Sequence, residues 1–547
     1  MHAAHSSKCW DYLILTASHS RQAAAYESQL KRRMETQALR SVREAFVVAD
    51  LEGKRIGSGG STLQCLAEVV NRERHKNGLL RATPLEILKR LRILIVHAGG
   101  DSRRLPAYGP CGKIFVPVPG GCSNPCGATL FDRLVPAFLE LPAGAEGAGQ
   151  VVVSAGDALN QFDASAVDFT AAGITALGCY SPPQEAARHG VFCIDRRGAI
   201  RLFLQKPSLE EQAAYGAINP AGETVLDIGV MSFDAAAAVR MLEAFGLETT
   251  STNGELKFSA EARQNLLTLG VDLYREICCA MGSEATLEHY VRSARASGSP
   301  WSDDLFRRIF PALRAIPFQA QIVPKCRFLH FGSSRQLISS GLALAAQDRG
   351  APPESTVLAM NNEVESGNIR GSESWVEGCR VRAPLTLGGW NLVVGVDVDE
   401  PLWLPRGACL DVLKGRNRRE APVYFIRCYG IDDTFKDALH QGATLCGKDL
   451  RDWLASVGAR SEDIWSESHS PEERNLWNAR VFPAEPDSAG YRRWLWMYDP
   501  HAASAEQKRA YLNADRYSAA EMAWLADQED FHLRRDAILA AQRRKPY

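Results

Sequence analysis

The segment HAGGDSRRLPAYGPCGKIFVPVP, residues 97–119, groups residue types that suit phosphate chemistry. Gly99 and Gly100 follow an apolar run, and backbone N–H groups at glycine can approach a phosphate where a Cβ would collide. Arg104 and Lys113 follow as fixed cations that would neutralise charge on a pentavalent phosphorus. A lone glycine pair would be an ordinary surface turn. The combination of AGG, RRL and GK in one strand-loop-strand unit predicts a site that transfers a phosphate-containing group.

A second glycine-rich segment, GSGGST, runs from Gly57 to Thr62. We expect it to form a loop between a strand and a helix that begins near Leu63, with N–H groups that meet a nucleotide base or its phosphates. An ordinary flexible turn is the alternative. The candidate nucleotide-binding residues are Gly57, Ser58, Gly59, Gly60, Gly99, Gly100 and Arg103.

These segments lie among alternating strands and helices. LRILIV, QVVVSA and ITALGCYS read as buried strands, FDRLVPAFLEL as a helix, and HGVFCIDRRGAIRLFLQKP as a hairpin that turns at Arg197 and Gly198. Helices dominate onward to about residue 320. The alternation predicts an α/β fold over residues 1–320.

The pattern of apolar and polar residues changes after residue 320. Short apolar pieces separated by glycine and polar turns, over residues 321–415, indicate β-helical coils without a strict repeat period, and a β-sandwich is the alternative. Residues 416–547 are rich in Trp and charge, and we expect helices at 505–513 and 518–543 that cap the rest.

Composition excludes several classes of protein. The 547 residues are 46% hydrophobic, and 63 basic side chains nearly balance 64 acidic ones, so we expect neither a nucleic-acid nor a membrane partner. Fourteen scattered cysteines fit reduced thiols in the cytoplasm. A zinc site at Cys122 and Cys126 is disfavoured because no second spaced pair accompanies them.

The segment from 97 to 119 resembles the signature of the sugar nucleotidyltransferases, GGxGTRLxP followed by PK. The variant AGGDSRRLPAYGPCGK is more similar to the L-fucose-1-phosphate guanylyltransferases, including that half of bifunctional fucokinase enzymes. Ser102 and Arg103 stand where the broader family has Gly and Thr, and Gly112 replaces its proline. The likeness continues in RIGSGGSTLQCL, SAGD, FLQKP, LDIGVMSF, DLYREI, FLHFGSS and LWNARVFP. It implies a Rossmann-like domain, then a β-helix-like domain and a helical C-terminal segment.

The resemblance also implies roles for single residues. Asp157 would bind Mg²⁺ (or Mn²⁺), which prefers carboxylate oxygen, although a helix N-cap is its alternative role. Asp272 is a candidate second metal ligand. Asp227 competes for that role and, with Gly229, matches the position beside the sugar. Lys206 matches the lysine that holds the sugar phosphate. Arg104 and Lys113 would be the catalytic residues.

The implied reaction joins GTP and L-fucose 1-phosphate into GDP-L-fucose and releases pyrophosphate. Another sugar 1-phosphate is an alternative acceptor. A sugar kinase is disfavoured because no PxxxGLGSS segment occurs in the sequence, so a separately encoded fucokinase would supply the sugar phosphate. A non-catalytic scaffold is disfavoured because the signature residues are present. The oligomeric state is left open.

Overall fold

The computed structural model describes residues 9–79, 81–120, 128–250, 254–351, 355–365 and 367–544, so that Cys122 and Cys126 lie outside it. The chain is mixed α/β, as the sequence predicted. It divides into two compact units, one made of Met1–Gly99 and Arg133–Phe328, the other of Gly100–Asp132 and Leu329–Tyr547. This division differs from the predicted boundaries at 320 and 415, because the segment after Gly99 belongs with the C-terminal residues.

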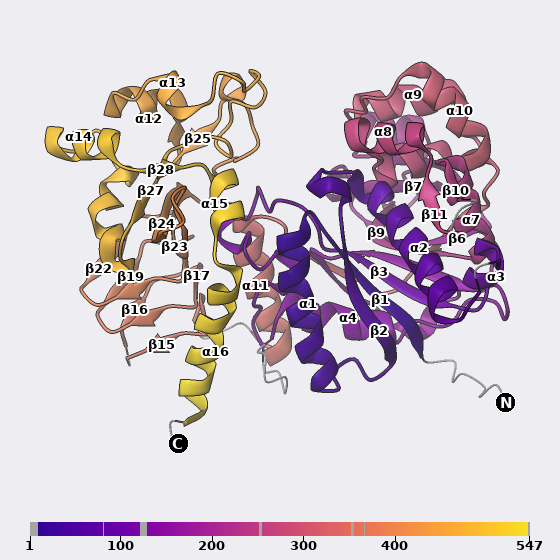
Figure 1. Ribbon diagram of the computed structural model, residues 1–547, viewed down its shortest axis with the longest axis horizontal. Coiled ribbons are helices and arrows are strands. Elements are labelled where there is room, and N and C mark those ends of the chain that lie inside the picture. The colour runs from indigo at the N-terminus through magenta and orange to yellow at the C-terminus, as the bar shows by residue number, and fades with distance from the viewer. Residues whose placement is uncertain are drawn as a thin grey trace. The chain divides into compact units, whose positions relative to one another are not determined.

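The first unit is built on a nine-stranded mixed sheet. Seven of the strands follow the order β12-β6-β9-β4-β3-β1-β2, and the other two, β7 and β8, form a hairpin beside β9. Its strands are β1 (Trp10–Ala17), β2 (Val42–Ala49), β3 (Arg92–His97), β4 (Gln150–Ala155), β6 (Ile174–Ser181), β7 (Gly190–Ile194), β8 (Ile200–Gln205), β9 (Thr224–Phe233) and β12 (Phe318–Ile322). β2, β1, β3 and β4 are parallel neighbours, and β1, β2 and β3 run side by side in Figure 1. The predicted hairpin at Arg197 and Gly198 is confirmed as β7 and β8.

The same unit also contains helices. They are α1 (Ser20–Glu35), α2 (Gly57–Lys76), α3 (Pro84–Leu88), α4 (Leu130–Leu139, which enters the unit at Arg133), α5 (Pro183–Ala186), α6 (Leu209–Ala214), α7 (Ala235–Ala244), α8 (Ala260–Leu269), α9 (Leu287–Ala296) and α10 (Asp303–Arg314). Asp234, Ser259, Thr286 and Ser302 cap α7 to α10 by accepting a backbone N–H bond in the first turn. A short π-helix, Leu273–Ile277, follows α8 and carries part of the site below.

The sheet brings candidate residues together at one edge. β3 ends at His97 and β4 at Ala155, and parallel strands deliver their following loops to the same edge. β9 is antiparallel to β4, with Val230 opposite Ser154, so Gly229 and Asp227 lie at the carboxyl end of β4. Residues from 97 to 99, from 155 to 157 and from 227 to 229 therefore meet at this edge.

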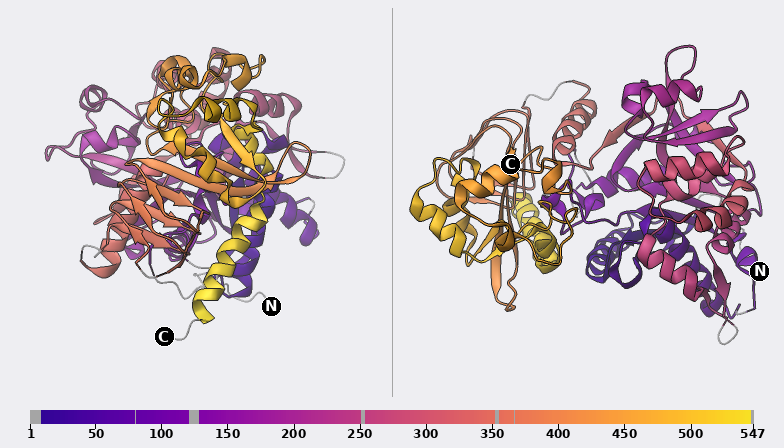
Figure 2. Two further views of the ribbon diagram at one scale, coloured as in Figure 1. Left: turned by 90° about the vertical axis from the view of Figure 1, so that its left-hand side faces the viewer. Right: turned by 90° about the horizontal axis from the view of Figure 1, so that it is seen from above.

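In the second unit, short parallel strands stack in three sheets. The first contains β14 (Val357–Met360), β17 (Ser374–Glu377), β20 (Leu392–Val394) and β23 (Ala408–Arg416); the second β15 (Glu363–Val364), β18 (Arg380–Val381) and β21 (Asp397–Val398); the third β16 (Ile369–Arg370), β19 (Leu385–Leu387) and β22 (Leu402–Leu404). Figure 2 (left) shows the stack in salmon and orange.

The stack repeats at a spacing of 17 residues, which the sequence reasoning did not find. Asn391 donates from its side chain to the Ala408 carbonyl 17 residues later at 2.9 Å, and its own N–H reaches the Ser374 hydroxyl 17 residues earlier. Trp375 pairs with Leu392, and Leu392 with Cys409, all completely buried. Apolar residues of successive coils thus stack on one another.

Antiparallel strands and helices complete this unit. They are β13 (Arg327–His330, which enters the unit at Leu329), α11 (Ser334–Arg349), β24 (Pro422–Gly430), β25 (Thr444–Leu445), β26 (Lys448–Asp449), α12 (Leu450–Val457), α13 (Ser461–Ile464), β27 (Phe482–Glu485), α14 (Ala505–Asn513), β28 (Arg516–Tyr517), α15 (Ala519–Leu525) and α16 (Gln528–Arg544). The helix expected at 505–513 is confirmed. The expected helix 518–543 is two helices, because Ala526 is extended and Asp527 donates its N–H to the Lys414 carbonyl. Within the described ranges, no helix combines the length and hydrophobicity needed to cross a bilayer.

Candidate active site

Three carboxylates of the first unit lie within electrostatic range of the Tyr274 hydroxyl. Burial raises the pKa of Tyr274 well above its usual 10, and Asp227, Asp272 and Asp157 all act in the same direction. Because these charges reach one hydroxyl, three of the residues singled out in the sequence share one site. Asp157 precedes a strand, β5 (Ala158–Gln161), so the helix N-cap that was its alternative role is not formed.

Asp227 is the most deeply buried of the three, with 5% of its surface exposed. The chain bends at Gly229, whose φ of +73° favours glycine, and the Gly229 N–H donates to Asp227 Oδ1 at 2.8 Å. A Cβ on Gly229 would lie 3.4 Å from the Tyr274 hydroxyl. Burial raises the pKa of Asp227 to about 7, and the Gly229 N–H lowers it. A buried carboxyl with one recorded bond is suited to receive hydroxyl groups of a sugar.

Asp272 caps the π-helix. Its Oδ1 accepts the N–H groups of Tyr274 and Arg275 at 3.0 and 2.9 Å, and its Oδ2 accepts the Ser58 hydroxyl at 3.2 Å. Burial lowers the pKa of His97 to about 4. The negative charge of Asp272 acts in the opposite direction and is the smaller effect. His97 Nε2 is 2.9 Å from the Thr62 hydroxyl. The ring is thus a neutral partner of Thr62.

The expected loop Gly57–Thr62 is wrong, because helix α2 already begins at Gly57. Gly60 donates its N–H to the Val271 carbonyl at 3.0 Å, and a Cβ at Gly57 would lie 2.3 Å from that carbonyl oxygen. A Cβ at Gly59 would lie 2.9 Å from Ile277. Close packing against the segment that carries Asp272 therefore requires these glycines, and nucleotide binding by Gly57, Ser58, Gly59 and Gly60 stays a prediction.

Lys206 and Asp272 line one cavity of about 570 Å³. Lys206 follows β8 with a φ of +51°, which is uncommon for a residue other than glycine, and its N–H donates to the His189 carbonyl. Within the described residues no hydrogen bond or ion pair is recorded for its ammonium group. Arg275 and Arg292 add two cations to the lining. The cavity therefore combines three cations with two carboxylates, Asp272 and Glu211.

Sequence reasoning missed both arginines. Arg275 lies in the quoted motif DLYREI, pairs with the fully buried Glu276 and donates to the Ser297 carbonyl at 3.2 Å. Arg292 is exposed on α9 and donates to the Tyr215 hydroxyl at 2.8 Å. Only the fold brings α9 to the end of β8, so no sequence signal marked Arg292.

The division of the chain into two units falls within the glycine pair of the signature, between Gly99 and Gly100. The N–H groups of Ala98 and Gly99 donate to the Thr16 hydroxyl, which fixes the end of β3. Gly100 has a φ of +113°, and a Cβ there would meet open space. Gly100 is therefore required by backbone conformation, whereas Gly99 is restricted by the Ala17 backbone 3.3 Å from its Cβ position.

The cations of the signature lie in the second unit. Arg103 pairs with Asp101 at 3.0 Å and lies over the Trp477 ring, whereas Arg104 is exposed. Lys113 begins a 3₁₀ turn after Gly112, whose φ is +69°. Proline cannot adopt that angle, which explains the departure from the broad family pattern at this position.

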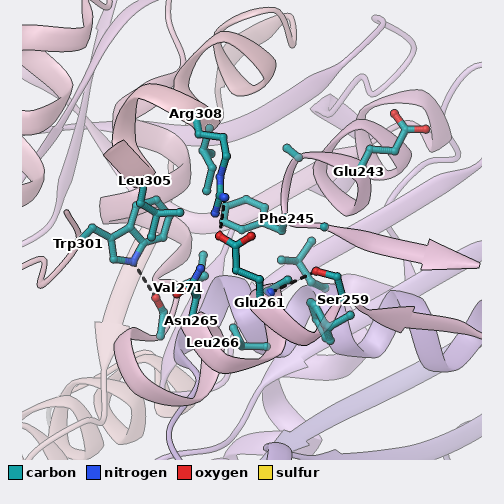
Figure 3. Close-up of a pocket in the computed structure, with 17 residues that line it drawn as sticks. Glu243, Phe245, Ser259, Glu261, Asn265, Leu266, Val271, Trp301, Leu305 and Arg308 are labelled. Atoms are coloured by element: carbon teal, nitrogen blue, oxygen red, sulfur yellow. Dashed lines mark hydrogen bonds and ion pairs between the residues drawn. The ribbon is translucent and has the colours of Figure 1, made fainter. Parts of the chain in front are cut away.

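A further cavity of the first unit, of about 380 Å³, is lined in part by Gly270 and Val271 (Figure 3). Trp301 donates to the Gly270 carbonyl there at 3.0 Å, and Arg308 pairs with Glu261 across it. Its lining is mainly apolar, and none of the predicted site residues contributes to it.

The carboxylates fit a magnesium ion held partly by substrate. Among the described residues no three His, Cys, Asp or Glu side chains are grouped as a metal site made of protein ligands alone. Mg²⁺ usually takes one or two carboxylates together with substrate phosphates; Asp272 lines the cationic cavity, and Asp157 lies within electrostatic range of the same Tyr274 hydroxyl.

The model of the fucose pyrophosphorylase domain matches residues 85–487, about three-quarters of the chain. The chain belongs to the fucose pyrophosphorylase family. It is 26% identical over 564 residues to a bifunctional fucokinase/GDP-fucose pyrophosphorylase of Arabidopsis thaliana, an alignment that covers 94% of this chain and 50% of the relative. It is 25% identical over 510 residues to an L-fucokinase/L-fucose-1-P guanylyltransferase of Bacteroides fragilis, with 90% and 48% covered.

A third family member is the fucose-1-phosphate guanylyltransferase of Homo sapiens. It is 24% identical over 521 residues, with 87% of this chain and 81% of the human protein covered. The chain thus spans about half the length of the two bifunctional relatives and about four-fifths of the human one.

Proposed function

We propose that the protein transfers a guanylyl group from GTP to L-fucose 1-phosphate, giving GDP-L-fucose and pyrophosphate. Membership of the family supports this reaction class. The single observation of the structure that carries the proposal is the cavity shared by Lys206 and Asp272, where cations for a sugar phosphate lie next to a carboxylate for a metal-bound triphosphate.

The acceptor is a dianion, and the cavity offers matching charge. Lys206, Arg275 and Arg292 would hold the phosphate, with the arginine forks fixing its oxygens in a defined orientation. Asp227 would accept hydroxyl groups of the sugar ring. Positioning of this kind accounts for much of the acceleration in phosphoryl transfer.

In the reaction an oxygen of the sugar phosphate attacks the α-phosphorus of GTP in line. The new O–P bond forms as the bond from the α-phosphorus to the bridging oxygen breaks, and that oxygen leaves with pyrophosphate. No general base is required because the attacking oxygen is already ionised. Arg104 and Lys113 would neutralise charge on the transition state and the leaving group.

Asp157 and Asp272 would hold Mg²⁺, which neutralises triphosphate charge when bound. Gly99, Gly100 and Arg103 would approach the nucleotide, with the first turn of α2 as a further candidate. We also infer a Rossmann-like first unit and β-helical coils for the 17-residue stack, an interpretation that the three parallel sheets support.

Partners and compartment follow as parts of the same proposal. A separately encoded fucokinase would supply L-fucose 1-phosphate, an idea supported by the fucokinase named in two relatives. The cysteines of the described ranges are free thiols, most of them buried, which supports a reducing compartment such as the cytoplasm.

The acceptor cavity is tested by comparing three variants. Lys206→Ala and Arg292→Ala should each raise the KM for L-fucose 1-phosphate, by about tenfold for the loss of a charge-assisted hydrogen bond, and leave the KM for GTP unchanged. Arg308→Ala, an arginine of the separate cavity in Figure 3, is the matched control and should change neither constant. A rise in the KM for GTP alone would assign the cavity to the nucleotide.

A further inference from the structure

The segment that carries Arg103 and Arg104 is fastened to distant parts of the second unit. The Ser334 N–H donates to the Arg104 carbonyl at 2.9 Å, and Arg103 lies 5.7 Å from the centre of the Trp477 ring. Ser334 and Trp477 belong to FLHFGSS and LWNARVFP, two quoted motifs to which the proposed chemistry gives no role. Both motifs contact the signature segment directly.

A buried network holds the next part of the segment through Tyr108. The Tyr108 hydroxyl donates to Glu377 Oε2 at 3.1 Å and accepts from Trp375 Nε1 at 2.7 Å. Arg535 of helix α16 forms a bidentate ion pair with Glu377, and Asn361 donates to Glu377 Oε1 at 2.9 Å. The side chain of Glu377 is completely buried and that of Arg535 is 8% exposed. Helix α16 and the residue that follows β14 thus converge on Glu377 of β17, which accepts the Tyr108 hydroxyl.

A second buried ion pair contacts Pro106, which lies two residues before Tyr108 in the chain. Arg427 of β24 donates to the Pro106 carbonyl at 2.8 Å and pairs with Asp411 of β23 at 2.8 Å, with side chains 2% and 3% exposed. The Pro106 carbonyl already accepts the Gly109 N–H at 3.0 Å in a 3₁₀ turn, so the guanidinium supplies a second hydrogen bond to it. Residues 104, 106 and 108 are therefore each tied to a different segment.

Buried ion pairs are an expensive way to stabilise a protein. Desolvation offsets much of their attraction, and apolar residues of the same volume often give equal or greater stability. Two such pairs, both directed at the short segment 106–108, are better explained by orientation than by stability. The segment they orient carries Arg104 on one side and Gly112 and Lys113 on the other.

We propose that this buried network of the second unit is a positioning device for the signature cations, and that Tyr108, Glu377 and Arg427 are positioning residues of the transfer reaction. The inference rests on one part of the proposed function, namely the action of Arg104 and Lys113 on the triphosphate. It gives the C-terminal 130 residues a task, because helix α16 supplies Arg535 and β24 supplies Arg427.

Tyr108→Phe tests the proposal, with Tyr511→Phe as the matched control. Both rings are completely buried in the second unit and both hydroxyls are hydrogen-bonded, that of Tyr511 to the Val481 carbonyl at 3.1 Å. Only Tyr108 belongs to the signature segment. Tyr108→Phe should lower kcat about 10- to 100-fold, the cost of a displacement near 1 Å, and leave the KM for L-fucose 1-phosphate within about twofold. Tyr511→Phe should lower only the Tm.

Hydrogen exchange of residues 101–116 gives a second readout that needs no turnover. Exchange there should quicken in Tyr108→Phe and stay as in the wild type in Tyr511→Phe. Equal effects of the two variants on kcat and exchange would overturn the positioning role. If the wild type transfers no nucleotide at all, the proposed function fails, and the exchange result alone decides whether the network orders the segment.

Discussion

Replacing Asp227 by asparagine should make the first unit more stable at pH 8 and weaken sugar-phosphate binding at the same time. Asparagine keeps the size of the side chain and an oxygen that accepts the Gly229 N–H. It removes the negative charge of a residue that is 5% exposed and that, among the described residues, accepts a hydrogen bond from Gly229 alone. A charge held in such a place costs stability wherever it is ionised in the folded protein.

The magnitude follows from the raised pKa of Asp227. The usual pKa is 3.8 and burial raises it to about 7, so between these values the folded state holds a proton that the unfolded state has lost. The stabilising contribution of this proton is complete below the unfolded pKa and is lost as the pH rises through about 7. At about 1.4 kcal/mol per pH unit, the wild type should lose roughly 3 kcal/mol between pH 5 and pH 8 that the Asp227→Asn variant does not lose.

Urea unfolding of both proteins at pH 5 and pH 8 measures this quantity. Other titrating groups cancel in the difference between variant and wild type, so the change of that difference with pH belongs to Asp227. The KM for L-fucose 1-phosphate should rise about tenfold in the variant, for loss of a hydrogen bond to a charged group. A difference in unfolding free energy that is the same at both pH values would refute the assignment of a buried, perturbed carboxyl.

Three other substitutions test single features. Asp157→Asn should raise the Mg²⁺ concentration needed for half-maximal turnover, and a metal titration that matches the wild type would remove Asp157 from the metal site. Gly112→Pro should lower kcat by at least about tenfold because the φ of +69° before Lys113 is closed to proline, and full activity would show that this turn is not needed in its present form. Gly60→Ala should lower the free energy of unfolding by about 1–3 kcal/mol, because its Cβ would lie 2.6 Å from Leu266 Cδ1, and an unchanged urea midpoint would contradict the packing role.

Several patterns that depend on neighbouring residues were read correctly from the sequence. Buried runs such as QVVVSA became strands, and the turn at Arg197 and Gly198 became a hairpin, because alternation and turn residues act over a few positions. The convergence of Asp157, Asp227 and Asp272 on Tyr274 was not readable, because it needs an antiparallel strand inserted beside β4.

The glycines of GSGGST show why a correct observation can mislead. Their number pointed to a loop near phosphates, but packing requires them, since a Cβ on Gly57 would collide with the Val271 backbone and one on Gly60 with Leu266. A sequence shows that a Cβ is excluded without showing what excludes it. The same limit applies to Arg292, which reaches the cavity of Lys206 only through the placement of α9.

The stacked strands raise a related point about periods. The spacing of 17 residues between Ser374 and Asn391, and between Asn391 and Ala408, is regular, although these three residues differ in type. Other positions repeat at the same spacing with the same residue, as Gly378 and Gly395 or Leu385 and Leu402 do. The period is therefore present in the sequence, and the strand pairing shows which residues to compare.

The central claim is tested most directly by pyrophosphate release from the purified protein with Mg²⁺, the four common nucleoside triphosphates and a panel of sugar 1-phosphates. We predict release with GTP and L-fucose 1-phosphate together, and a large loss of turnover with little change in nucleotide affinity in Lys113→Ala. Release with another pair would keep the mechanism and replace the substrates. No release with any pair would contradict the account and favour a non-catalytic role.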